Sequence, residues 1–267
     1  MNVVVCVKQV PDTTEIKIDP VTNTLMREGV PSILNTFDTY ALEAALRLKD
    51  ADKSTKVTVI SMGLPKAKDV LKEALSVGAD EAFLVSDRPF GGADTLATSY
   101  TLTRTIQFLE ERKGEKFDII FCGKQAIDGD TAQVGPEVAE HMGYAQVTYA
   151  TEVELENGKA IVRKDTDDGY CVLAAQLPCV ISVTKAPYEL RFATIKGKLK
   201  ANRTEIETLT NEVLQIEPDR IGLKGSPTKV KKSFTPELKK AGIVLSGDDP
   251  GAMGTKLVGM LRDAKVL

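Results

Sequence analysis

The stretch FDIIFCGKQAIDGDTAQVGPEVAEHM, residues 117–142, decides the fold of this 267-residue chain. It opens with an apolar run, 119–122, that is typical of a buried strand and ends at Gly123. A polar loop, 124–131, follows, and the stretch closes with a helical pattern. A strand, a loop and a helix in this order form the repeating unit of an α/β protein with a parallel sheet.

The helical part of this stretch has a defined start. Its apolar residues recur at four-residue spacing: Val134, Val138 and Met142. Pro136 lacks an amide hydrogen, which is tolerated in the first turn of a helix but removes a hydrogen bond further in. We therefore expect the helix to begin near 131–133. In an ordinary turn that binds no ligand, Asp130 or Thr131 would be its N-cap.

The loop and the helix start together predict an anion site, because backbone amides and the positive end of the helix dipole converge there. Gly123 and Gly129 let the backbone approach a ligand. Asp128 and Asp130 would repel a phosphate, and suit ribose hydroxyls or helix capping. An ordinary strand-to-helix turn that binds nothing explains the same pattern. The loop also carries side-chain donors: Lys124, Gln125, Thr131 and Gln133.

Strands alternate with helices through the first half of the chain. β-Branched or apolar runs predict three more strands: 2–8, 56–61 and 82–86. Asn35 and Asp38 form a capping-box-like start to the first helix, and the next two helices end at Gly78 and near Gly114. The predicted fold class is α/β, with a Rossmann-like, mostly parallel sheet joined by right-handed crossovers.

The pattern after the central helix is that of an antiparallel addition to this sheet. Two alternating segments, 151–156 and 159–164, flank Asn157-Gly158, a dipeptide strongly favoured in two-residue hairpins. Two further strands are expected: 170–175 and 179–184. An earlier segment, 11–32, is predicted to form a hairpin or an extended excursion.

From residue 187 onward only 250–262 has a helical pattern. Scattered apolar residues in this tail would bury little by themselves: Ile206, Leu209, Val213, Ile216, Ile221 and Leu223. A partner subunit would give them a surface, so we expect an α/β domain over 1–190 and a partner-wrapping arm over 191–267. A solvated extension is the alternative.

Composition narrows the possible functions. Hydrophobic residues at 42% supply a core, and a net charge of -3 disfavours nucleic acid as a partner. The sequence has no apolar run of about 18 residues and no signal-peptide pattern, so we expect a cytoplasmic protein without membrane insertion. The single histidine, His141, falls in the last turn of the central helix, where a cation favours the dipole. We expect no metal site and no catalytic side chain, with the chemistry supplied by a cofactor.

The loop GKQAIDGDTAQVGP resembles the nucleotide loop of the β-subunits of electron-transfer flavoproteins. The resemblance extends in order through VCVKQV, NTFDTYALEAALRLK, VISMG, ALSVGAD and RFATIKGKLKA, and so covers nearly the whole chain. It implies a Rossmann-like domain that holds an adenine nucleotide. It also implies a C-terminal arm that embraces an α-subunit carrying FAD.

The resemblance assigns two sets of residues. The nucleotide contacts of the family fall on Cys6, Asn35, Thr36, Phe37, Asp38, Met62, Gly123, Lys124, Gln125, Ala126, Ile127, Asp128, Gly129, Asp130, Thr131, Ala132, Gln133 and Val134. From the residues alone, Asn35 is at least as well explained as an N-cap and Phe37 as a core residue. The segment that docks on partner dehydrogenases falls on Ala193, Thr194, Ile195, Lys196, Lys198, Leu199 and Lys200, with Ile195 as the apolar centre and the lysines as a basic rim.

The resemblance implies a different ligand in each of two branches. In the housekeeping branch the β-subunit holds structural AMP and docks dehydrogenases, and only the α-subunit carries FAD. In the electron-bifurcating branch the same pocket holds FAD, which accepts hydride from NADH. One electron then goes to ferredoxin or flavodoxin and one, through the α-subunit FAD, to an acyl-CoA dehydrogenase-type flavoenzyme. Gly129, Val134 and Pro136 in DGDTAQVGP resemble the bifurcating branch.

An ATP-using enzyme or nucleotide sensor built on the same scaffold is a third possibility, since one fold serves many functions. The loop lacks the G-x-x-x-x-G-K-[ST] arrangement of a P-loop, which disfavours this alternative.

Overall fold

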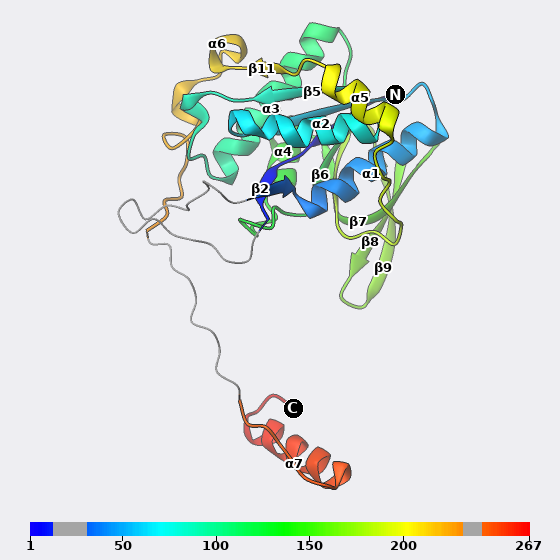
Figure 1. Ribbon diagram of the computed structural model, residues 1–267, viewed down its shortest axis with the longest axis vertical. Helices are drawn as coiled ribbons and strands as arrows, with labels where there is room; N and C mark the ends of the chain where they lie inside the picture. The colour runs from blue at the N-terminus through cyan, green and yellow to red at the C-terminus, as the bar shows by residue number, and fades with distance from the viewer. Residues whose placement is uncertain (13–30, 232–241) are drawn as a thin grey trace. The chain divides into compact units, whose positions relative to one another are not determined.

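A computed structural model of the chain describes residues 1–12, 31–231 and 242–267. A nine-stranded sheet runs in the order β11-β5-β4-β1-β6-β10-β7-β8-β9 (Figure 1). The strands are β1 (Asn2–Cys6), β4 (Lys56–Met62), β5 (Glu81–Val85), β6 (Ile119–Gly123), β7 (Ala145–Glu156), β8 (Lys159–Thr166), β9 (Gly169–Gln176), β10 (Cys179–Val183) and β11 (Glu207–Leu209). The helices are α1 (Thr36–Ala51), α2 (Lys68–Val77), α3 (Thr95–Lys113), α4 (Val134–Met142), α5 (Ile195–Arg203), α6 (Asn211–Leu214) and α7 (Pro250–Asp263). The predicted α/β class with a mostly parallel sheet is confirmed.

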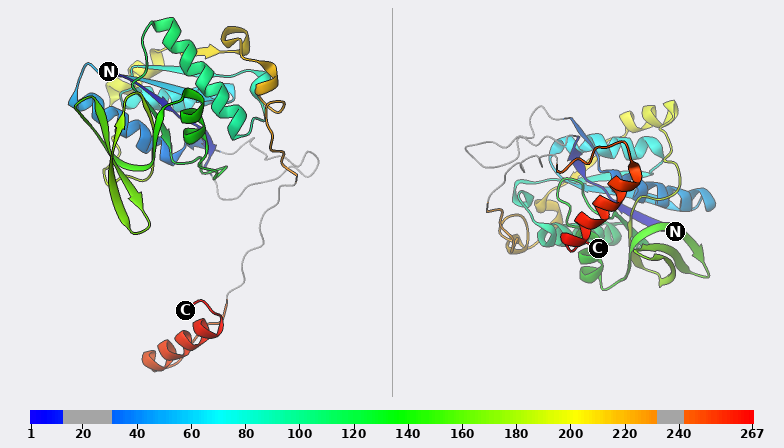
Figure 2. Two further views of the ribbon diagram at one scale, coloured as in Figure 1. Left: turned by 180° about the vertical axis from the view of Figure 1, so that it is seen from behind. Right: turned by 90° about the horizontal axis from the view of Figure 1, so that it is seen from below.

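The central strands are buried on both faces, as their β-branched composition predicts. Along β1, Val3 and Val5 pack into the core beneath α1 and α2, whereas Val4 and Cys6 pack into the core beneath α3 and α4. Figure 1 looks onto the face that carries α1 and α2, and the left view of Figure 2 onto the face that carries α3. Because helices cover both faces of the central strands, the ends of these strands are the places where a ligand can reach the sheet.

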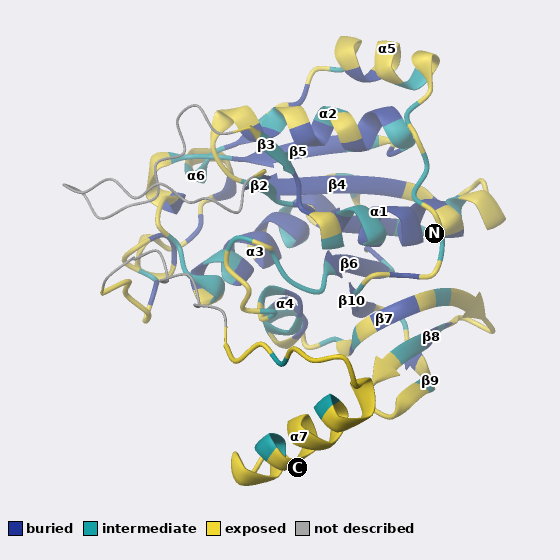
Figure 3. Cartoon of the chain, turned by 60° about the horizontal axis from the view of Figure 1, so that its bottom comes forward, coloured by how far each residue is buried: buried dark blue, intermediate teal, exposed yellow. Residues whose placement is uncertain are grey.

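The antiparallel addition is present, and its hairpin is the predicted one. β7 and β8 are antiparallel partners, and the turn between them has φ values of 51° at Asn157 and 73° at Gly158. β9 continues the meander at the edge of the sheet, where Figure 3 shows it largely exposed. One feature differs from the sequence prediction. β10 lies between β6 and β7 and is parallel to both. The antiparallel strands β7, β8 and β9 are therefore joined to the parallel sheet through β10.

Short strands frame the excursion that was predicted for 11–32. β2 (Gln9–Pro11) pairs antiparallel with β3 (Ser32–Leu34), which agrees with a hairpin-like path at both ends of the segment. The interior of the prediction, residues 13–30, lies outside the described residues.

The chain buries much of the tail that was expected to need a partner. β11 adds to β5 as a parallel edge strand, and the first compact unit extends to residue 231 rather than ending at 190. The expectation that the scattered apolar residues need another subunit is therefore wrong for four of them. These are Ile206, Leu209, Ile216 and Ile221, each at most 4% exposed. Val213 and Leu223 stay exposed, at 43% and 70%.

The described C-terminal residues, 242–267, belong to a second unit. The helix predicted at 250–262 is present as α7, with Pro250 in its first turn and the Asp249 carboxylate accepting a hydrogen bond from the Gly251 amide. Its apolar Leu257 and Val258 are 48% and 41% exposed. In the described parts of the chain, no helix combines the length and hydrophobicity needed to cross a membrane.

Burial of the tail by the domain itself predicts a stability effect. Leu209→Ala should lower the free energy of unfolding by about 3 kcal/mol, because it leaves a cavity at a fully buried position. Val213→Ala, at an exposed site in the adjoining α6, should cost less than about 1 kcal/mol. Urea unfolding of the purified chain measures both, and equal small effects would show that β11 does not belong to the core.

Candidate nucleotide-binding site

The strand order reverses between β1 and β6, the position at which open α/β sheets form a ligand-binding crevice. From β1 the chain steps through α1 to β4 and β5 on one side, and α3 then carries it back to β6 on the other side of β1. Ligands of open α/β sheets bind at such a reversal, outside the carboxyl ends of the strands. The polar loop 124–133 follows β6 at this edge, as the sequence predicts.

A run of backbone amides points to an anion in this loop. α4 begins at Val134, and Asp130 and Ala132 before it have left-handed φ values of 57° and 54°. Alternation of right- and left-handed residues turns successive amides toward one concave side. Within the part of the chain that the structure describes, five amides in sequence donate to no protein acceptor: those of Thr131, Ala132, Gln133, Val134 and Gly135. They lie at the positive end of the α4 dipole, where a phosphate is stabilised.

Both acidic residues of the loop have side-chain partners within the protein, and neither caps the helix. Gln133 occupies the N-cap position without a side-chain hydrogen bond, so the cap at Asp130 or Thr131, expected for a turn that binds no ligand, is absent. The Asp130 carboxylate instead accepts from the Gln125 side chain. Lys8 Nζ contacts both carboxylate oxygens of Asp128, at 2.7 and 2.9 Å. Their repulsion of a phosphate is therefore reduced.

Asn35 holds the loop in place from the start of α1. Its side chain is fully buried, and its Nδ2 donates to the Gln125 carbonyl at 2.8 Å. Its Oδ1 accepts from the Ile127 amide at 3.0 Å. Asn35 precedes the helix but makes no side-chain capping bond, so the predicted capping box is wrong. The Asn35 side chain thus bonds to one acceptor and one donor of the loop, whereas a helix cap would use only its oxygen as an acceptor for a helix amide.

Asp38 ties the carboxyl ends of β1 and β6 together. Its carboxylate accepts from the Lys8 amide at 2.7 Å and from the Gly123 amide at 3.2 Å. A Cβ at Gly123 would stand 2.2 Å from Asp38 Oδ1, so only glycine fits there. Burial raises the pKa of Asp38 from 3.8 to about 7, against the hydrogen bonds from Asn35, Lys8 and Gly123, which lower it.

The remaining predicted contacts surround the same edge. The Cys6 thiol is buried, and its hydrogen bond with Cys122, followed by desolvation, holds its pKa well above the ordinary range. Met62 ends β4 and lines a small pocket with Lys8 and Asp128. Thr36 is exposed at the start of α1. The sequence prediction did not include Lys8, although it lies in the VCVKQV segment.

The loop also contacts an aromatic residue that the sequence prediction missed. The Lys124 ammonium lies 5.7 Å from the centre of the Phe37 ring and 5.1 Å from that of Tyr149 in β7. No sequence signal marks Tyr149: the irregularity is seen in the structure, where the buried residues of β7 pass from Val147 to Ala150 instead of alternating.

His141 lies in the last turn of α4 as predicted, but it does not act there as a cation. Burial, and then the nearby charge of Arg220, lower its pKa. Its ring packs edge-on against Tyr100 with 5.6 Å between ring centres. Its surroundings thus disfavour the charged form that the helix dipole would favour.

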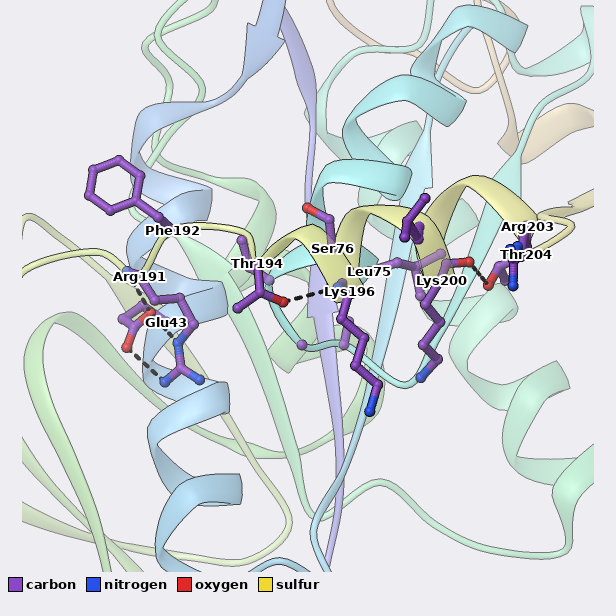
Figure 4. Close-up of a pocket in the computed structure, with 15 residues that line it drawn as sticks. Glu43, Leu75, Ser76, Arg191, Phe192, Thr194, Lys196, Lys200, Arg203 and Thr204 are labelled. Atoms are coloured by element: carbon purple, nitrogen blue, oxygen red, sulfur yellow. Dashed lines mark hydrogen bonds and ion pairs between the residues drawn. The ribbon is translucent and has the colours of Figure 1, made fainter.

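The predicted docking segment lies on α2 and does not contribute to the crevice. Thr194 caps α5, and a Cβ at Gly197 would stand 2.2 Å from the Ser76 carbonyl oxygen, so glycine permits the close helix contact. Ile195 is 81% exposed, and Ala193 is half-buried. Figure 4 shows Lys196 and Lys200 extending from the same side of α5, beside a cavity of about 910 Å³.

The fold and the loop define a doubly wound α/β protein with an anion-binding helix start at the strand-order reversal. Residues 22–214 match the family described as the electron transfer flavoprotein domain. The β-subunit of the electron transfer flavoprotein from Megasphaera elsdenii is 54% identical over 250 residues, 93% of either chain. That from Clostridium acetobutylicum is 52% identical over 245 residues, 92% of either chain. The caffeyl-CoA reductase-Etf complex subunit CarD of Acetobacterium woodii is 45% identical over 267 residues, the whole of both chains.

The chain therefore belongs to the electron transfer flavoprotein family, as a relative of its β-subunits. A role in electron transfer follows from this membership, and the resemblance found in the loop is confirmed.

The contacts of Asn35 predict a change in the dynamics of the loop. Asn35→Ala should speed hydrogen exchange at the Ile127 amide about tenfold, because that amide loses its acceptor. Asn35→Asp keeps the acceptor and should leave Ile127 closer to the wild type, although the Gln125 carbonyl loses its donor. Exchange followed by mass spectrometry measures both, and unchanged exchange in the alanine variant would contradict the role.

The buried carboxyl of Asp38 predicts a pH dependence of stability. Because its folded pKa of about 7 exceeds the ordinary 3.8, the folded state retains a proton that the unfolded state releases. The contribution of this group to stability is complete below pH 3.8 and is lost as the pH rises through about 7. Asp38→Asn should remove this part of the slope in unfolding free energy against pH. Parallel slopes for the two proteins would contradict it.

Proposed function

We propose that this chain is the FAD-binding β-subunit of an electron-bifurcating electron transfer flavoprotein. FAD in the crevice accepts hydride from NADH, and the electrons pass to ferredoxin or flavodoxin and, through the α-subunit FAD, to an acyl-CoA dehydrogenase-type flavoenzyme. The observation that carries the proposal is the run of amides at 131–135, which suits the pyrophosphate of a dinucleotide. The full-length similarity to a subunit of the caffeyl-CoA reductase-Etf complex supports the bifurcating branch.

The residues of this chain would bind and orient the cofactor. FAD supplies the redox chemistry when bound, so the protein needs to place it and adjust its electrostatic surroundings. Asn35 donates a hydrogen bond to the loop, and Asp38 accepts one from the Lys8 amide at the end of β1. The Lys8 ammonium pairs with the Asp128 carboxylate in the loop. The small pocket at Met62 lies at the carboxyl end of β4, next to β1, where an adenine would be in reach of the strand ends.

Purification of the heterodimer with its α-subunit tests the proposal directly. Two FAD per heterodimer, with reduction of flavin on mixing with NADH, is the expected result. One FAD with one AMP, and no reduction by NADH, would establish instead the housekeeping role in which AMP is structural. Acid extraction followed by chromatography counts the nucleotides, and stopped-flow absorbance follows the reduction.

A charge placed beside the amides should weaken binding. Gln133→Glu puts a carboxylate at the N-cap of α4 and should raise the Kd of the nucleotide about tenfold. Gln146→Glu makes the same change near the amino end of β7, which lies at the opposite edge of the sheet, and should leave binding unchanged. Similar affinity in both variants would show that the phosphate does not lie on these amides.

The docking of a partner dehydrogenase is proposed for the segment around α5. Ile195 and Leu199 are 81% and 53% exposed, and Phe192 before them is 94% exposed. Lys196, Lys198 and Lys200 surround this apolar group, as in an interface with a hydrophobic centre and a basic rim. In Figure 4 Arg191 is held by Glu43, so it fixes the approach to α5 rather than joining the rim.

Ile195→Asp tests this docking surface. The exposed site should tolerate the change without loss of folding, whereas an apolar contact with the partner would be lost. We expect at least a tenfold lower rate of electron transfer to the dehydrogenase with unchanged flavin content. Equal loss of flavin and of transfer would show that the residue is structural.

The arm that embraces the α-subunit is proposed for the second unit alone. α7 carries apolar Leu257 and Val258 at 48% and 41% exposure, which a partner surface would cover. The cytoplasmic location stays a prediction from the sequence.

A further inference from the structure

A group of lysine and aromatic side chains lies next to the nucleotide loop, on strands that neighbour β6 in the sheet. In register, Gly123 of β6 lies beside Val183 of β10, and Val183 lies beside Ala150 of β7. Ala150 in turn lies beside Lys164 of β8. The four positions form one row across neighbouring strands, which are spaced about 4.8 Å apart. Lys164 is therefore about 14 Å along this edge from the start of the loop.

Tyr149 is turned toward this row by an irregularity in β7. The pairing of β7 shifts register with both neighbours at this point, between Ala150 and Glu152 and between Ile181 and Val183. Tyr149 has a left-handed φ of 58°, which is rare for a bulky residue, and its side chain is 40% exposed. Bulges of this kind redirect a side chain, and they are frequent beside functional sites.

Two lysines flank the Tyr149 ring without acidic partners. Lys124 Nζ and Lys164 Nζ lie 5.1 and 5.9 Å from the ring centre. Lys164 donates to Thr148 Oγ1 at 3.2 Å, and neither lysine has a carboxylate within 4 Å among the residues described. Lys8, on the other side of the loop, is in contrast paired with Asp128. The edge beyond the loop thus carries uncompensated positive charge beside an exposed ring.

We infer that Tyr149, Lys124 and Lys164 bind the half of the dinucleotide that AMP lacks, and so determine the preference for FAD over AMP. This inference rests on the proposed function. A planar ring system packs on an aromatic side chain, and the flavin ring takes up negative charge when it is reduced. An ammonium group without a carboxylate partner can compensate such a charge. AMP bound at the amides 131–135 would end before this group, because it has neither the second phosphate nor the second ring.

Competition between the two nucleotides tests the inference. The heterodimer is equilibrated with equimolar FAD and AMP, washed, and extracted to count both nucleotides. Lys164→Gln and Tyr149→Asn should each lower the ratio of FAD to AMP in the β-subunit about tenfold, which is the size of one lost charge-assisted contact for the lysine and of one lost ring contact for the tyrosine. Asparagine tolerates the left-handed backbone at 149, so the second variant removes the ring without straining the bulge.

Two controls separate binding from support of the strand. Lys159→Gln removes a charge at the far end of β8, and Thr148→Val removes the hydrogen bond to Lys164 while keeping its charge. Neither should change the ratio. An unchanged ratio in Lys164→Gln and Tyr149→Asn, with FAD bound normally by the wild type, would overturn this inference alone. A wild type that takes up AMP and no second FAD would overturn the proposed function and the inference with it.

Discussion

Two buried polar side chains at the start of α1, Asn35 and Asp38, fix the positions of the strand ends and of the loop that form the candidate site. Asp38 accepts hydrogen bonds from amides at the ends of β1 and β6, and Asn35 bonds to both sides of the loop that follows β6. A buried polar group without a partner costs about 1–3 kcal/mol, so these residues are stable inside the protein only while the loop keeps its path. The bonds at Gln125 and Ile127 fix this path, and among the described residues the amides 131–135 are left without a protein acceptor. Positioning of the anion site is thus a property of α1 as much as of the loop.

The electrostatics of the edge differ on the two sides of this loop. On the side of β1 and β4, Lys8 contacts Asp128. On the side of β10, β7 and β8, Lys124 and Lys164 stand beside Tyr149 without carboxylates in the described part of the chain. A ligand with a neutral adenine at one end, phosphates in the middle and an electron-accepting ring at the other would match this gradient. The docking segment on α5 is structurally separate, because it packs on α2 and adds nothing to the crevice. Under the proposed function, changes in one of these two places should leave the role of the other unaffected.

The tail shows how an apolar pattern can be assigned to the wrong surface. Ile206, Leu209, Ile216 and Ile221 have no regular spacing, and such residues can be covered by any neighbouring surface. In the structure β11 pairs with β5, Leu209, Ile216 and Ile221 join the core beneath α3, and Ile206 joins the core beneath α1 and α2, so the domain buries them itself. Only contacts between residues more than a hundred positions apart distinguish this outcome from a partner interface. The same limit applies to β10, whose apolar run predicts burial but not its place between β6 and β7.

The sequence by itself determined the elements whose signals are local. The β-branched runs of β1 and β4 predicted buried strands, Asn157-Gly158 predicted its hairpin, and the order strand, polar loop and Pro136 predicted the helix start with its free amides. Tertiary structure alone decided what the polar residues do. Asn35 and Asp38 read locally as a helix cap, but Asn35 bonds to a loop about 90 positions later and Asp38 to the amides of Lys8 and Gly123 at the ends of β1 and β6. Tyr149 became exposed through a bulge that only the pairing of β7 with two neighbours reveals. The physical reason is that backbone propensity depends on adjacent residues, whereas the partner of a buried polar group is fixed by the packing of the whole domain.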